Sequence, residues 1–215
     1  MKMIKTLVGC LCLAAMVSCG ETSQSVSNET TTDSVMATES NAVIENIMAR
    51  RSIRKYIDKT VARDTLDLIM ECGINAPNGQ NKQSWEVRVV DNPQVMAEIK
   101  DVLTKAYPDM PMAADCFRGA PVMVFIARDK SYDFSPYDCG LMAENMMLSA
   151  TSLGVGSICL GSPVRFINDN SACAPVLERL AFSEGYELCL CVGLGYADEA
   201  PEAKPRDKAK VKYVE

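Results

Sequence analysis

Two continuous apolar runs constrain the fold of this chain more than any other feature of its sequence. They are PVMVFIARD at residues 121–129 and ELCLCVGLGY at residues 187–196. A short apolar run bounded by turn-forming residues is typical of a strand that is buried on both faces. Such a strand needs cover on each side, so the pattern predicts a central sheet with helices packed against it.

The rest of the domain supplies further candidates for the sheet and for its cover. Alternation in WEVRVV predicts a strand at 85–90, and the glycine-flanked run GVGSICLG predicts another at 154–161. Asp64 is the expected cap of one helix. Helices are predicted at residues 42–50, 64–75, 93–107, 138–153 and 174–182. Strands and helices mix along the chain, so the predicted fold class is α+β.

Two of these segments carry additional information. The stretch APNGQNKQS at 76–84 is rich in turn-forming residues and is predicted to be a loop. The helix candidate at 138–153 has an apolar surface wide enough for burial on more than one side, as in a domain centre or a subunit interface. Burial in the core of a single chain explains that surface equally well.

The N-terminal segment has the pattern of an export signal. Lys2 and Lys5 precede an apolar run, residues 7–17, that is too short to span a bilayer. The following AMVSCG resembles a bacterial lipoprotein signal, in which Cys19 would be the lipidated first residue, although Met16 stands where leucine is preferred. The alternative is an ordinary signal peptide that is cleaved elsewhere. The predicted organisation is a signal peptide at 1–18, a lipidated cysteine and flexible tether at 19–41, and a folded domain at 42–215.

The tether is predicted from its composition. Residues 21–41 are mostly Ser, Thr, Asn and Glu, and they offer too little apolar surface to offset the entropy of ordering them. The lipid would then be the only membrane contact. The expected location is the cell envelope, with the domain facing the periplasm or the exterior.

Composition excludes several classes of function. The chain contains no histidine, which excludes Ser-His-Asp and Cys-His catalysis, histidine-bound zinc and a histidine-ligated haem. The net charge of −6 and the sequence pI near 4.9 argue against nucleic acid as a partner. The seven cysteines of the domain match no metal or disulfide pattern, so no metal site is predicted and most are expected to be small buried side chains. A disulfide in an exported domain stays open.

Two cation clusters are the candidates for a binding site. RRSIRKY at 50–56 carries four cations around Ser52, and a second pair, Lys204 and Arg206, lies near the C-terminus. A half-buried cation cluster is costly without an anion, and the arginine fork matches phosphate oxygens. If the two clusters meet in space, they would form one phosphate clamp. The alternative is a solvated basic face.

Five segments follow one another along the domain: RRSIRKY (50–56), APNGQNKQSW (76–85), DCG (138–140), LGVGSICLG (153–161) and LGYADEAPEAKPR (194–206). Together and in this order they resemble the nitroreductase family of FMN-dependent oxidoreductases. The resemblance runs from about residue 42 to the C-terminus. It implies a nitroreductase-like α+β fold with a central, mainly antiparallel sheet. It also implies an intertwined homodimer with two FMN sites at the interface, each built from both subunits.

The resemblance assigns roles in FMN binding to matching positions. Phosphate contacts fall to Arg50, Ser52, Lys204 and Arg206, and Arg51 would make backbone or phosphate contacts. Arg54 would lie near the pyrimidine edge of the flavin, at N1 and O2, where a fixed cation favours the reduced state. The flavin edge near N5 would be lined by Cys159, Leu160 and Gly161. The residues expected to reach the flavin of the partner subunit are Pro77, Asn78, Gly79 and Asn81.

The sequence departs from the family pattern in the loop. Asn78 replaces a serine but can still form hydrogen bonds. Ser84 replaces a proline, so the loop exit is expected to be less rigid. Gly161 and Ser162 match the acidic residue and glycine that some members place beside N5. No secure match is found in 110–120 for further ring contacts, which leaves the choice of substrate open.

The reaction implied by the resemblance has two steps, in which a donor reduces the flavin and an oxidised acceptor then takes the electrons. No side chain is expected to act as general acid or base. NAD(P)H belongs to the cytoplasm, so an exported enzyme is expected to draw on a different donor or on a membrane partner. The expected acceptor is a nitroaromatic, a quinone or a similar compound. The alternatives are a lipid-anchored FMN-binding module without turnover and a structural lipoprotein.

Overall fold

The computed structural model describes residues 41–215. The predicted signal peptide at 1–18, the lipidation predicted at Cys19 and the predicted tether up to residue 40 lie outside the described residues. No helix within residues 41–215 is both long and apolar enough to cross a membrane.

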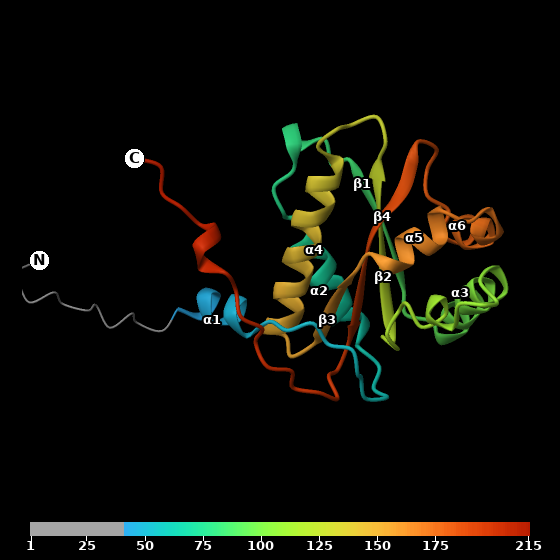
Figure 1. The fold of residues 1–215 in the computed structure, drawn as a ribbon, viewed down its shortest axis with the longest axis horizontal. Coiled ribbons are helices and arrows are strands. Elements are labelled where there is room, and N and C mark those ends of the chain that lie inside the picture. The colour runs from blue at the N-terminus through green and yellow to red at the C-terminus, as the bar shows by residue number, and fades with distance from the viewer. Residues whose placement is uncertain (1–40) are drawn as a thin grey trace, which may run out of the picture. The chain divides into compact units, whose positions relative to one another are not determined.

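A four-stranded sheet forms the centre of the domain (Figure 1). The strand order is β1-β2-β4-β3, and each neighbouring pair is antiparallel. The two continuous apolar runs are the two central strands, as their burial on both faces requires. The strands are β1 (Trp85–Val90), β2 (Val122–Asp129), β3 (Gly156–Leu160) and β4 (Tyr186–Gly195).

Helices cover both faces of the sheet and enclose two apolar clusters (Figure 1). On one face α2 (Arg63–Ile74) and α4 (Ser135–Ser152) bury Ile69, Met142 and Met146. The other face is covered by α3 (Pro93–Ala106), α5 (Ser162–Asn168) and α6 (Ala174–Leu180). The predicted α+β architecture is therefore confirmed, and four of the seven domain cysteines are buried as expected: Cys116, Cys139, Cys173 and Cys191.

Three local predictions differ from the structure. Asp64 lies in the first turn of α2, and Ala62 occupies the N-cap instead. The helix predicted at 138–153 begins earlier, at Ser135, because Pro136 suits the first turn of a helix. The helix α5 was not predicted, because it has only seven residues and is too short to show a clear period.

Two terminal segments, called the arms here, differ from the rest of the domain. The first arm is α1 (Ala42–Ala49), which buries none of its own residues. It is attached to α4 through Asn46, whose Nδ2 donates to the carbonyl oxygen of Leu148 at 2.8 Å. The second arm is the tail at 207–215, which contains the 3-10 turn η4 (Lys208–Lys210). Both arms expose large apolar side chains, including Val43, Ile44, Met48, Val211 and Tyr213.

Candidate cofactor site

The segment that follows α1 is held against the edge of the sheet. Ser52 forms an isolated parallel bridge with Ser157 of β3, and the Ile53 N–H donates to the carbonyl oxygen of Ser157 at 2.9 Å. Ile53 is itself buried. The first cation cluster therefore has a fixed position beside β3, although it lies outside regular secondary structure.

The chain after β4 runs alongside this segment and binds it through backbone groups. The Ile57 N–H donates to the Tyr196 oxygen at 3.0 Å, and the Asp198 N–H donates to the Lys55 oxygen at 2.9 Å. The Glu199 carboxylate accepts from the backbone N–H groups of Arg54 and, at 3.2 Å, Lys55. These contacts bring together two segments that are about 140 residues apart in the sequence.

The two cation clusters meet at one cavity of about 150 Å³. This volume suits a phosphate group rather than a whole flavin nucleotide. All six residues predicted to lie at the phosphate or pyrimidine end of FMN line the cavity. Its lining is Arg50, Arg51, Ser52, Arg54, Pro201, Glu202, Ala203, Lys204 and Arg206. The structure thus places the predicted residues together, while their assignment to FMN stays a prediction.

The cavity lining carries five cations and one carboxylate, that of Glu202. A second carboxylate, that of Glu144 on α4, lies 3.9 Å from Arg50 Nε but is half exposed, so it offsets the charge only weakly. An excess of positive charge with one added hydroxyl, that of Ser52, is the chemistry that a phosphate dianion requires.

The arginines of the cavity also keep donors for a ligand. The Arg51 Nη1 donates to the carbonyl oxygens of Met48 and Arg50, at 2.6 and 2.9 Å. Arg54 Nη1 donates to the Ser52 oxygen at 3.1 Å, and Arg206 Nη1 donates to the Lys204 oxygen at 3.0 Å. Each guanidinium has five N–H groups, so these backbone contacts orient the side chains and leave further donors available. The residues present therefore fit the phosphate of FMN.

The strand β3 leads away from this cavity along the predicted flavin edge. Cys159 is exposed and Leu160 is buried, and a Cβ added to Gly161 would meet open space. Burial raises the pKa of the Cys159 thiol, and the Glu144 carboxylate raises this pKa further while Arg50 lowers it. Ser157 of the same strand forms the bridge with Ser52, so the strand edge and the cation cavity are neighbours.

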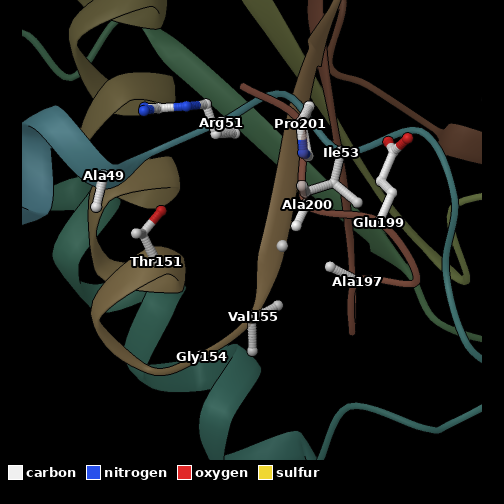
Figure 2. Close-up of a pocket in the computed structure, with 11 residues that line it drawn as sticks. Ala49, Arg51, Ile53, Thr151, Gly154, Val155, Ala197, Glu199, Ala200 and Pro201 are labelled. Atoms are coloured by element: carbon white, nitrogen blue, oxygen red, sulfur yellow. The ribbon is translucent and has the colours of Figure 1, made fainter. Parts of the chain in front are cut away.

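A larger hollow of about 500 Å³ adjoins the cation cavity, and Arg51 and Pro201 line both (Figure 2). Its other walls come from the end of α1, the end of α4, the start of β3 and the chain after β4, and most of the side chains are small. The hollow provides open space beside the cations, on the side of α1.

The loop residues predicted to contact a flavin lie elsewhere in the same chain. None of Pro77, Asn78, Gly79 and Asn81 lines the cation cavity. The Gly79 N–H donates to Asp138 in the first turn of α4, whereas α1 is attached at Leu148, ten residues further along. This separation is about 15 Å along the helix axis. Asn78 also uses its Oδ1 within the loop, where it accepts from the Gln83 N–H at 2.9 Å.

Ser84 was expected to make the loop exit less rigid, and the structure adds a restraint that this expectation did not include. Ser84 is buried, and its hydroxyl donates to Asp138 Oδ2 at 2.9 Å. Three carboxylates that contact these segments, those of Asp138, Glu144 and Glu199, were not identified from the sequence. The segment DCG at 138–140 includes Asp138 and was part of the resemblance. Its role could not be predicted, because its hydrogen-bond partners lie more than 50 positions away in the sequence.

Comparison with known proteins agrees with this geometry. A family model described as the nitroreductase family matches residues 47–196. An NADPH-flavin oxidoreductase of Vibrio harveyi is 31% identical over 183 residues, which cover 80% of this chain and 72% of the relative. A relative from Methanothermobacter thermautotrophicus, provisionally named as an NADH dehydrogenase/NAD(P)H nitroreductase, is 32% identical over 123 residues. These cover 55% of this chain and 60% of that relative's length.

The fold is also shared with solved structures. A nitroreductase of Bacteroides fragilis with bound FMN matches with a TM-score of 0.74 and 28% sequence identity, covering 82% of this chain and 100% of that one. The fold and the matched segments define an α+β oxidoreductase of the flavin-dependent class. The chain belongs to the nitroreductase family. The predicted family and fold are confirmed, and the predicted cofactor, FMN, is the one bound in the Bacteroides fragilis structure.

Proposed function

We propose that this protein binds FMN and passes electrons from a reduced donor, NAD(P)H or an envelope donor, to a nitroaromatic, a quinone or a similar acceptor. The observation that carries the proposal is the meeting of two distant cation clusters at one cavity. When bound, FMN supplies the hydride and electron transfer chemistry.

The chain's own residues would bind and orient the cofactor. Arg50, Ser52, Lys204 and Arg206 would hold the phosphate through charge-assisted hydrogen bonds. Arg54 would place a fixed positive charge near the pyrimidine edge, where it favours the negative charge of the reduced state. Glu199 supports this arrangement because it accepts from the backbone N–H groups of Arg54 and Lys55 and thereby fixes the direction of that segment.

A second copy of the chain would complete each site. The loop at 77–81 is remote from the cation cavity of its own chain, and the arms expose apolar side chains that a partner could cover. A twofold dimer with antiparallel α4 helices would bring the start of one α4 towards the end of the other. The loop of one subunit would then approach the flavin held by its partner.

The membrane-anchored location is part of the proposal and rests on the lipoprotein-like signal around Cys19. An enzyme outside the cytoplasm would lack a pool of NAD(P)H, so its donor would be an envelope reductant or a membrane partner. Cell fractionation tests this location. Recovery of the protein in the soluble cytoplasmic fraction would contradict it.

The experiment that tests the function is a spectrum of the purified mature protein. We expect flavin absorbance that bleaches when a reductant is added and returns when a nitroaromatic or a quinone follows. A yellow protein that bleaches but reoxidises no faster with either acceptor would favour the FMN-binding module without turnover. A colourless protein that does not bind added FMN would contradict both.

A further inference from the structure

The loop between α2 and β1 holds an unfavourable backbone conformation. Three of its non-glycine residues have left-handed φ angles, namely Gln80 at 56°, Asn81 at 52° and Gln83 at 50°. Side chains other than glycine rarely adopt this region, and such conformations persist only when the surroundings hold them in place. The loop must therefore be restrained by contacts outside itself.

A buried carboxylate supplies that restraint at both ends of the loop. Asp138 is only 3% exposed. Its Oδ1 accepts from the Gly79 N–H at 2.9 Å, and its Oδ2 accepts from the Ser84 hydroxyl at 2.9 Å. Within residues 41–215 the carboxylate has no ion pair with a cation. Its position in the first turn of α4 favours a negative charge, so the helix and the two donors together stabilise it.

The exit of the loop is fixed by further bonds. The carbonyl oxygen of Ser84 accepts from the Asp129 N–H at 3.0 Å and from the hydroxyl of Ser135. Ser135 Oγ in turn accepts from the Asp129 N–H at 3.0 Å. Ser84 is thus joined to the start of α4 and to the end of β2 at the same time.

Tyr132 closes the loop from another side. Its hydroxyl is buried without a hydrogen-bond partner among the described residues, and it leaves no room for a Cβ at Gly79. Lys82 Nζ lies 4.1 Å from the centre of the Tyr132 ring. The loop is therefore confined between Tyr132 and Asp138, while Asn81 at its tip stays exposed.

We propose that Asp138 is a positioning residue for FMN binding, acting through Gly79 and Ser84 to hold the loop in a form that presents Asn81 to a flavin bound by the partner subunit. The inference rests on the proposed function. Ser84 acts together with Asp138 in this proposal. Its hydrogen bond to Asp138 restrains the loop exit, whereas serine as a residue type does not restrain the backbone.

Substitution of Asp138 separates positioning from charge. In Asp138→Ala both donors lose their acceptor, and we expect the dissociation constant of FMN to rise at least tenfold. In Asp138→Asn the side-chain oxygen can accept from the Gly79 N–H, and the side-chain amide can donate to the hydroxyl oxygen of Ser84. We therefore expect most of the affinity for FMN to be retained. Ser84→Ala removes one of the two bonds, and a rise of about threefold or more is expected.

The matched control is Asn168→Ala. Asn168 Nδ2 donates to the Leu188 oxygen at 2.8 Å on the other face of the sheet, so the variant loses a comparable bond without touching the loop. Thermal unfolding of each apoprotein would report stability, and fluorescence titration with FMN would report binding. Backbone hydrogen exchange over Gly79–Ser84 would report the loop alone, and we expect faster exchange in Asp138→Ala.

Several outcomes would overturn the inference. A dissociation constant in Asp138→Ala within twofold of the wild type would show that the loop does not act on the flavin. Equal weakening in Asn168→Ala would show that only general stability matters. If Asp138→Ala does not fold, an unchanged affinity in Ser84→Ala would contradict the proposal in the same way. A wild-type protein that binds no FMN would instead overturn the proposed function itself.

Discussion

The central strands and the arms of this molecule are opposite in character. In β2 the side chains of Val124, Phe125 and Ile126 are fully buried. In the arms Met48 is 71% exposed and Tyr213 is 93% exposed. The core thus buries its apolar side chains within one chain, whereas the arms carry apolar side chains that the chain itself leaves exposed.

The candidate cofactor site lies where the arms meet the edge of the sheet, at β3. Arg50 directly follows α1, and Lys204 and Arg206 directly precede the tail, while Ser52 is bound to the sheet through Ser157. The sheet therefore gives the site its position, and the arms border its charged groups. It follows that substitutions in the core should lower the free energy of unfolding. Substitutions at the junction, where the arms meet the sheet, should weaken cofactor binding.

The largest effect is expected from the core. Phe125 is fully buried and packs edge-on against Phe117, with ring centroids 6.1 Å apart. Phe125→Ala should lower the free energy of unfolding by about 3–5 kcal/mol, because it removes apolar burial and leaves a cavity. Denaturant unfolding of the apoprotein would measure this. A loss below about 1 kcal/mol would mean that the core is not closed as described.

The next effect is expected at the junction. Arg206→Ala and Arg50→Ala should each weaken FMN binding by about 1.5–3 kcal/mol, the range for a hydrogen bond to a charged group. Lys208→Ala is the matched control, because Lys208 is a nearby tail cation that does not line the cavity. Titration of the apoprotein with FMN would measure all three. Unchanged affinity in both arginine variants would refute the phosphate clamp.

The same contrast explains how much the sequence could predict. The central strands were predictable because continuous apolar runs need burial on both faces, and this requirement is local to each run. Whether the two cation clusters meet could not be predicted from either one alone. No local pattern contains the bond that the Ile57 N–H donates to the Tyr196 oxygen, or the bond that the Arg54 N–H donates to the Glu199 carboxylate. The resemblance to a family supplied that link.

Ser84 shows why residue type alone gave an incomplete account of the loop. A serine in place of a proline removes a restraint on the backbone, which suggested a looser loop. In the structure its hydroxyl binds a carboxylate 54 positions away. The consequence of the replacement therefore depends on the tertiary partner, which the sequence does not display.

A smaller effect is expected where the arms would meet a partner. Met48→Asp places a charge on the exposed apolar face of α1, and we expect the dissociation constant of the proposed dimer to rise tenfold or more. Met112→Asp is the matched control, because Met112 is 60% exposed but belongs to the 3-10 turn that contacts α3 and α5 on the other side of the sheet. Analytical ultracentrifugation would compare the two. A wild-type protein that is monomeric at every concentration would contradict the proposal that a second copy of the chain covers the arms.

The smallest effect returns to the core and concerns pH. Burial, with a smaller contribution from Asp115, raises the pKa of the Cys116 thiol from 9.0 to about 12. The unfolded chain therefore releases this proton at a lower pH than the folded chain does, so stability is fully present below pH 9 and is lost as the pH rises towards 12. From Cys116 alone we expect the free energy of unfolding to fall by about 0.8 kcal/mol at half a pH unit above 9.

Cys116→Ala should flatten this part of the stability curve, measured by denaturant unfolding between pH 8 and pH 9.5. Cys72→Ala serves as the control at a half-exposed thiol. If the free energy of unfolding falls with pH equally in Cys116→Ala and the wild type, this thiol does not ionise at a higher pH in the folded chain than in the unfolded chain. The core around it would then be more open to water than its burial indicates.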